Sequence, residues 1–168
     1  LREAGIPTAA STAAESTDDA LAFARSVGYP IILKPRDAAG AAGTVRVDDD
    51  DQLRAACRAA GVDDGASVAL EEFVEGHEGF FDTITIQGRA APEFASHYFP
   101  NVLEAMRARW ISPQIIATNR VRDPDYEQVR EMGRRVIDVL GLETSATHME
   151  WFFGPKGLKF YEIGARPP

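Results

Sequence analysis

The chain has 168 residues, of which 45% are hydrophobic and 26% charged, so it can bury a core and is not a disordered segment. Its net charge of −8 disfavours nucleic acid or an anionic membrane surface as partner, because both require a broad positive potential. No apolar run approaches the roughly 20 residues of a membrane-spanning helix and no leader pattern opens the chain, so a cytoplasmic location is expected.

The first helix and the strands after it are predicted from spacing and breakers. In TDDALAFARSVG the apolar residues recur at helical spacing, which predicts a helix from an N-cap at Thr17 to a stop at Gly28. The short β-branched run IIL at 31–33 predicts a buried strand, and TVRV at 44–47 a second strand that returns after a glycine loop.

A second helix is expected after a cap at Asp50, ending at Gly61. Its apolar face includes Cys57, the single cysteine, which we expect to pack in the core and not to act as a nucleophile. SVALEEFV at 67–74 then has the composition of a strand.

The second half of the chain continues this mixed pattern. DTITIQGRAAPEFASHYF predicts two strands around Gly88, and a clear helical period runs from Asp123 to Gly141. Residues 97–113 fit no single period, so they are either a functional loop or a loop that contains a short helix at 102–109. The aromatic runs after residue 145 predict a final hairpin, and the whole order predicts an α+β fold with antiparallel sheets.

Lys34 ends a buried strand and precedes DAAGAAGT at 37–44. A buried ammonium group needs an anion, and the small loop, which includes Gly40 and Gly43, lets backbone N–H groups approach a ligand closely. These features suggest a polyphosphate clamp that is neither a Walker A loop nor a dinucleotide fingerprint. The alternative is a surface lysine beside a flexible turn.

Two glutamates lie in the final hairpin. If the turn is a three-residue loop of residues 155–157, Glu150 lies directly opposite Glu162, and their repulsion calls for a cation between them. In that register Trp151 pairs with Tyr161, and Phe152 with Phe160. Carboxylate ligands suit Mg²⁺ or Mn²⁺. A four-residue loop would instead put the two glutamates on opposite faces.

Together these segments resemble the ATP-grasp superfamily over essentially the whole chain. YPIILKPRDAAGAAG looks like its lysine strand and phosphate loop, LEEFVEGHE like its adenine and ribose segment, and HMEWFF with FYEIGARPP like its metal-binding end. The resemblance implies two α+β lobes with antiparallel sheets that grip ATP between them. The smaller lobe would comprise residues 1–75 and the larger lobe, with the metal site, residues 76–168.

The resemblance also implies a role for each matching residue. Lys34 would contact the α and β phosphates, and the loop around Gly40 and Gly43 would close over them. Glu71 and the backbones of Glu72 and Val74 would bind adenine, and Glu78 the ribose hydroxyls. Glu150 and Glu162 would hold the magnesium ions, and Arg166 would steady the transferring phosphoryl group. Gly164 stands where many members have asparagine as a further metal ligand.

The function that the resemblance implies is ATP-dependent ligation, in which a carboxylate is phosphorylated and an amine attacks the acyl-phosphate. Bicarbonate as the phosphoryl acceptor, as in carboxylases or carbamoyl-phosphate enzymes, is one alternative, and a nucleotide-binding module without turnover is another. The expected partners are a small carboxylate and an amine. An α/β domain before Leu1 and a catalytic tail after Pro168 are expected, so the isolated segment should be inactive.

Overall fold

The computed structural model describes residues 1–36, 43–107, 110–112 and 114–167. The chain divides into two compact units, one of residues 9–73 and one of residues 1–8 with 74–168. Residues 74–75 and the first eight residues therefore depart from the expected division into 1–75 and 76–168. The first eight residues join the larger unit because Ile6 is buried in its core and Thr8 bridges to Phe160.

The described strands (β), α-helices (α) and 3-10 helices (η) follow one another along the chain as β1 (Ser11–Ala14), α1 (Thr17–Val27), β2 (Ile31–Pro35), β3 (Val45–Val47), α2 (Asp50–Ala60), η1 (Val62–Asp64), β4 (Val68–Glu72), β5 (His77–Ile86), β6 (Arg89–Phe99), α3 (Val102–Arg107), β7 (Gln114–Thr118), η2 (Pro124–Tyr126), α4 (Glu127–Val139), β8 (Ser145–Gly154) and β9 (Gly157–Gly164).

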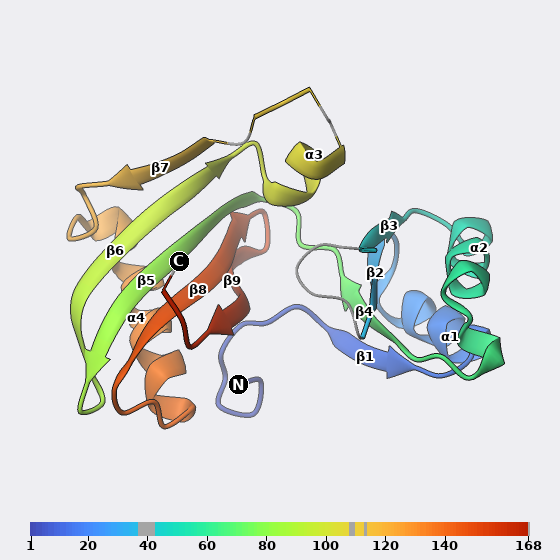
Figure 1. Ribbon diagram of the computed structural model, residues 1–168, viewed down its shortest axis with the longest axis horizontal. Coiled ribbons are helices and arrows are strands. Elements are labelled where there is room, and N and C mark those ends of the chain that lie inside the picture. Colours follow the sequence, from blue (N-terminus) through green and yellow to red (C-terminus); the bar gives the residue numbers. More distant parts are fainter. Residues whose placement is uncertain (37–42, 108–109, 113, 168) are drawn as a thin grey trace. The chain divides into compact units, whose positions relative to one another are not determined.

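In the smaller unit, the described strands form an antiparallel sheet in the order β1-β4-β2-β3, with α1 and α2 packed beside it (Figure 1). Apolar residues of the two helices and of the strands make one core, which includes Leu21, Leu53, Ile31, Leu33 and Leu70. Cys57 is fully buried in this core, which confirms its predicted packing role.

Both helices of this unit are capped one residue earlier than predicted. The side chain of Ser16, and not that of Thr17, accepts a hydrogen bond from the backbone N–H three residues on. Asp49 does the same in place of Asp50. Both capping residues have extended backbone angles, which is the geometry of an N-cap. The helices end at the predicted glycines.

In the larger unit, the described strands form an antiparallel sheet in the order β7-β6-β5-β8-β9. Figure 1 shows α4 lying across one face of this sheet. The core between them contains apolar side chains from α4 and from alternate positions of the strands, among them Val129, Met132, Val136, Phe81, Ala95, Met149 and Trp151. The described architecture is the predicted α+β fold with antiparallel sheets.

The final hairpin, β8 and β9, has the predicted register at its two glutamates and a different register near its turn. Glu150 lies opposite Glu162, as expected, and two residues earlier in β8, His148 lies opposite Gly164. The prediction was wrong for the aromatic residues, because Trp151 pairs with Phe160 and Phe152 with Lys159. The turn is two residues long, and a bulge at Tyr161 adds one residue to β9, so the two differences cancel beyond the bulge.

Two further segments have bounds that differ in detail from the predicted elements. The helical period predicted from Asp123 begins with the 3-10 turn η2, and α4 follows it and ends before Gly141. The region 97–113 contains the end of β6 and the short helix α3; residues 108–109 of the suggested helix lie outside the described residues. Among the described residues, no helix has the length and apolar character needed to cross a membrane.

Candidate functional site

The face of the large sheet that points away from α4 collects most of the polar side chains of the site. Side chains alternate along a strand, so the buried Phe81, Met149 and Trp151 point toward α4 and their neighbours point the other way. Strand pairing then brings six polar side chains onto this face: Glu78, Asp82, Tyr98, His148, Glu150 and Glu162.

Glu150 and Glu162 are direct cross-strand partners at the centre of this face. Glu150 is partly buried, and its Oε1 lies 3.4 Å from the hydroxyl of Tyr98, which donates to it, and 3.5 Å from Nε2 of His148. Glu162 is exposed. Two carboxylates placed opposite each other repel unless a cation lies between them, so this pair has the composition of a divalent-metal site.

His148 is hydrogen-bonded to Asp82, a residue that was not predicted from the sequence. Nδ1 of His148 lies 2.8 Å from Oδ1 of Asp82, and both side chains are largely buried. Hydrogen bonds from His148 to the carboxylate of Asp82 and, second, to that of Glu150 raise the pKa of His148 to about 9. The imidazolium is therefore flanked by two carboxylates. Asp82 was missed because its importance depends on the pairing of β5 with β8.

Glu78 is the most buried acid of the site, with 4% of its surface exposed. Its Oε2 accepts a hydrogen bond of 2.7 Å from the backbone N–H of Val102. Burial raises the pKa of Glu78 to about 7, and the negative charges of Glu150 and Glu162 add to the rise. The structure thus brings three of the predicted site carboxylates, Glu78, Glu150 and Glu162, close enough to influence one another.

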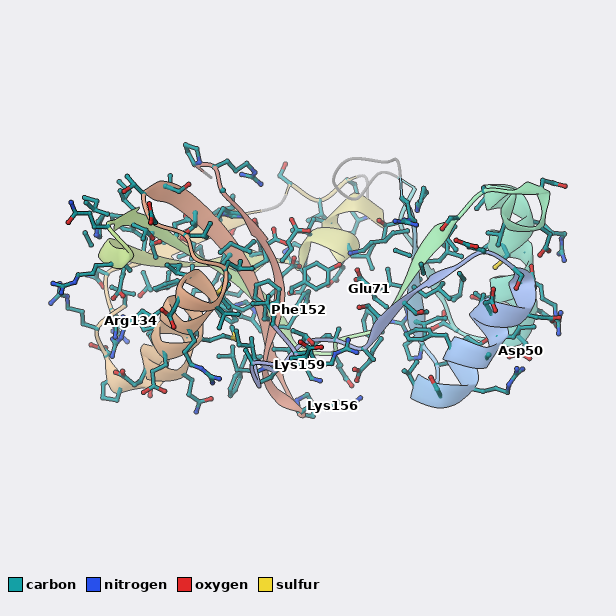
Figure 2. All side chains as sticks on the ribbon, turned by 90° about the horizontal axis from the view of Figure 1, so that it is seen from below. Asp50, Glu71, Arg134, Phe152, Lys156 and Lys159 are labelled. Atoms are coloured by element: carbon teal, nitrogen blue, oxygen red, sulfur yellow. The ribbon has the colours of Figure 1, made fainter. Side chains whose placement is uncertain are left out.

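In the smaller unit, the predicted lysine lies beside a predicted glutamate. Nζ of Lys34 is 2.8 Å from Oε2 of Glu71 in an ion pair without the alignment of a hydrogen bond. Glu71 extends from the end of β4 (Figure 2), and Lys34 comes from the neighbouring strand β2. Glu72 is bound to Ala10, the residue before β1, because its N–H donates to the carbonyl of Ala10 and its carboxylate accepts from the N–H of Ala10.

The remaining predicted residues are partly described. Gly40 lies outside the described residues, whereas Gly43 is described and has a φ of +72°. A Cβ at Gly43 would meet Cγ of Pro35 at 2.9 Å, so a larger residue would not fit there without movement. Val74 lies two residues after the end of β4. Arg166 is exposed, and its guanidinium donates to the carbonyl of Pro167 at 2.9 Å.

Comparison with known proteins finds relatives of this chain both by sequence and by fold. Residues 1–79 match the family model of the carbamoyl-phosphate synthase L chain, ATP binding domain. The carbamoyl phosphate synthase large chain of Thermotoga neapolitana is 25% identical over 169 aligned residues, which cover 99% of this chain and 15% of that protein. The chain therefore spans only a small part of this relative.

Solved structures share the fold over nearly the whole chain. An L-amino acid ligase from Bacillus licheniformis superposes with a TM-score of 0.74 at 21% identity, covering 99% of this chain and 38% of that one. An ATP-grasp ligase solved with a variant of its minimal precursor, Mg and ADP gives a TM-score of 0.70 at 20% identity, covering 99% and 48%. Together, these matches show that the chain has the ATP-grasp fold.

Proposed function

We propose that the chain is the ATP- and Mg²⁺-binding domain of a ligase that activates a carboxylate as an acyl-phosphate, which an amine or a similar nucleophile then attacks. The ATP-grasp fold supports this proposal. The observation that carries it is the pair of Glu150 and Glu162, which face each other across β8 and β9. A facing pair of this kind offers carboxylate oxygens from two strands to one divalent cation.

The donor set of this pair fits Mg²⁺. Both ligands are carboxylates, and the raised pKa of the neighbouring Glu78 reflects in part the negative charge that they concentrate there. Within the described part of the chain, no three His, Cys, Asp or Glu side chains converge in a way that could hold a metal. Two carboxylates from the protein, with water and phosphate oxygens as the other ligands, are the usual set for Mg²⁺ in nucleotide sites.

The proposed roles of the protein groups are electrostatic. When bound, Mg²⁺ would neutralise part of the phosphate charge, held by Glu150 and Glu162. Lys34, with the loop of Gly40 and Gly43, would bind the α and β phosphates, and Arg166 would steady the transferring phosphoryl group. Charge stabilisation by such fixed groups supplies much of the rate in phosphoryl transfer, and no protein nucleophile is required.

The nucleotide base and sugar would be recognised by the segment that leaves β4. The carboxylate of Glu71 and the backbones of Glu72 and Val74 would bind adenine, and Glu78 would accept hydrogen bonds from the ribose hydroxyls. Glu78 supports this role because one of its oxygens is held by Val102, and no described residue donates to the other. A carboxylate oriented in this way is a strong acceptor for a hydroxyl.

The phosphoryl acceptor has two candidates within the same chemistry. Bicarbonate is one, favoured by the match to carbamoyl phosphate synthases along the chain. A small amino acid is the other, favoured by the likeness to an L-amino acid ligase. ADP release by the full-length protein, measured with bicarbonate and with individual amino acids, distinguishes them. A protein that binds ATP and releases ADP with neither would be a nucleotide-binding module without turnover.

The nucleotide site itself is tested by calorimetry with a non-hydrolysable ATP analogue. The wild type should bind in a Mg²⁺-dependent manner, and Glu150→Gln and Glu162→Gln should each weaken that binding. Asp125→Asn, which removes an exposed carboxylate from η2, is a matched control that should leave it unchanged. Binding that is equally strong in both glutamine variants would refute the metal role of the pair.

A further inference from the structure

The loop between β6 and α3 contacts the start of β5 through one asparagine side chain. Oδ1 of Asn101 accepts a hydrogen bond of 3.0 Å from the backbone N–H of Glu78. Nδ2 of Asn101 donates a hydrogen bond of 2.7 Å to the carbonyl of Gly76. The carboxamide therefore binds the backbone on both sides of His77 and uses both of its ends in doing so.

The opposite side of the same segment lies against the end of β8. Gly76 has a φ of +152°, and a Cβ at this position would lie 2.5 Å from the backbone oxygen of Phe153. Such a distance is too short for any side chain, so the backbone of Gly76 approaches β8 as closely as a chain can. The segment is thus confined between the backbone of β8 and the side chain of Asn101.

The residue after Asn101 completes the arrangement at the carboxylate of Glu78. The backbone N–H of Val102 donates to Oε2, so the main chain of Glu78 is held by Asn101 and its side chain by the next residue. Asn101 also begins α3, because its carbonyl accepts from the N–H of Ala105. A buried carboxylate beside Glu150 and Glu162 would otherwise turn away from their charge.

We propose that Asn101 is a positioning residue that orients Glu78 for recognition of the nucleotide ribose, so that selectivity for ribose over 2′-deoxyribose depends on the loop before α3. This inference rests on the proposed ATP-binding function and on the proposed ribose contact of Glu78. Asn101 would touch neither the nucleotide nor the metal. It acts by holding the backbone and, through Val102, the carboxylate.

The test compares the affinities of the full chain for ATP and for 2′-deoxy-ATP, both with Mg²⁺, by calorimetry. The wild type should prefer ATP by about tenfold, the value of one hydrogen bond to a charged acceptor. Asn101→Ala should bring this ratio close to one, mainly by weakening ATP. Glu78→Gln should do the same, and Asn119→Ala, a change at an exposed asparagine, should keep the wild-type ratio.

Val102→Pro provides a second, independent variant. Proline is well tolerated at the first position of a helix, and it removes the N–H that holds the carboxylate. It should lower the ratio as Asn101→Ala does, and it keeps the inference testable if the alanine variant does not fold. Thermal unfolding of each variant checks the fold.

The outcomes separate the inference from the function on which it rests. Absence of Mg²⁺-dependent ATP binding by the wild type would overturn the proposed function and the inference with it. A wild type that binds ATP and prefers it over the deoxy form, with the preference lost in Glu78→Gln but retained in Asn101→Ala and Val102→Pro, would overturn only the inference. Equal weakening of both nucleotides by these two variants would also overturn it, because that result indicates a structural role.

Discussion

Replacing Glu78 by glutamine is expected to stabilise the protein at pH 8 and to have little effect at pH 5. The ordinary pKa of 4.5 rises to about 7 in the fold because the carboxyl group is buried and lies near two further carboxylates. A raised pKa means that the folded state binds the proton more tightly, so the stabilisation is complete below about pH 4.5 and is lost as the pH rises through 7. Glutamine carries no charge and can still accept from the N–H of Val102.

The size of the effect follows from the two pKa values. Each pH unit between them corresponds to roughly 1.4 kcal/mol, so the ionised Glu78 costs about 3 kcal/mol at pH 8. Little of this is screened by solvent, because only 4% of the residue is exposed. The free energy of unfolding of Glu78→Gln should therefore exceed that of the wild type by about 3 kcal/mol at pH 8.

Urea unfolding at pH 5, 6.5 and 8, without divalent cations, measures this difference. Trp151 is buried in the core of the larger unit, which also contains Glu78, so its fluorescence reports the unfolding of that unit. Subtracting the wild type removes the contributions of groups that both proteins share, including His148. A difference that does not change with pH, or a wild type that is the more stable at pH 8, would refute the argument.

Three further outcomes are expected. Burial lowers the pKa of His77 and His97, so the contribution of these two histidines to stability should fall as the pH drops below 6.5. The free energy of unfolding of His97→Phe, measured in urea and taken relative to the wild type, should therefore rise over that range; a difference that does not change with pH would contradict this. Gly76→Ala should cost more than about 2 kcal/mol in the same assay, because its Cβ would lie 2.5 Å from a backbone oxygen; a neutral change would refute the close approach. Arg134→Ala should cost less than about 1 kcal/mol, because Arg134 on α4 (Figure 2) is 51% exposed in its ion pair with Glu93; a larger loss would show that this pair matters to the fold.

Most of the fold was predictable because the signals are local. The spacing of apolar residues predicted α1 and α2, and the helices end at the predicted Gly28 and Gly61. The caps were displaced by one residue because a serine or an aspartate stood immediately before each predicted cap, and only backbone geometry selects between such neighbours. The segment around α3 gave no clear period, since the helix has only six residues.

The site was predictable where one hairpin carries it. Glu150 and Glu162 face each other as expected, although the turn and the aromatic pairing near it were wrong. A two-residue turn with a bulge leads to the same register at the glutamates as a three-residue loop without one. The alternation of residues along a strand does not reveal where a bulge lies. Two different hairpin geometries therefore predict the same pairing of Glu150 with Glu162.

The sequence was sufficient for the α+β class, for Lys34 at the end of a buried strand and for the facing glutamates, because each follows from residues near one another in the chain. The partners of these residues required the tertiary structure. Asp82 contacts His148 across 66 positions, and Asn101 contacts Glu78 across 23. Such contacts depend on the register between strands and on the path of a loop, which arise from the packing of the whole sheet against α4 and leave no period in the sequence.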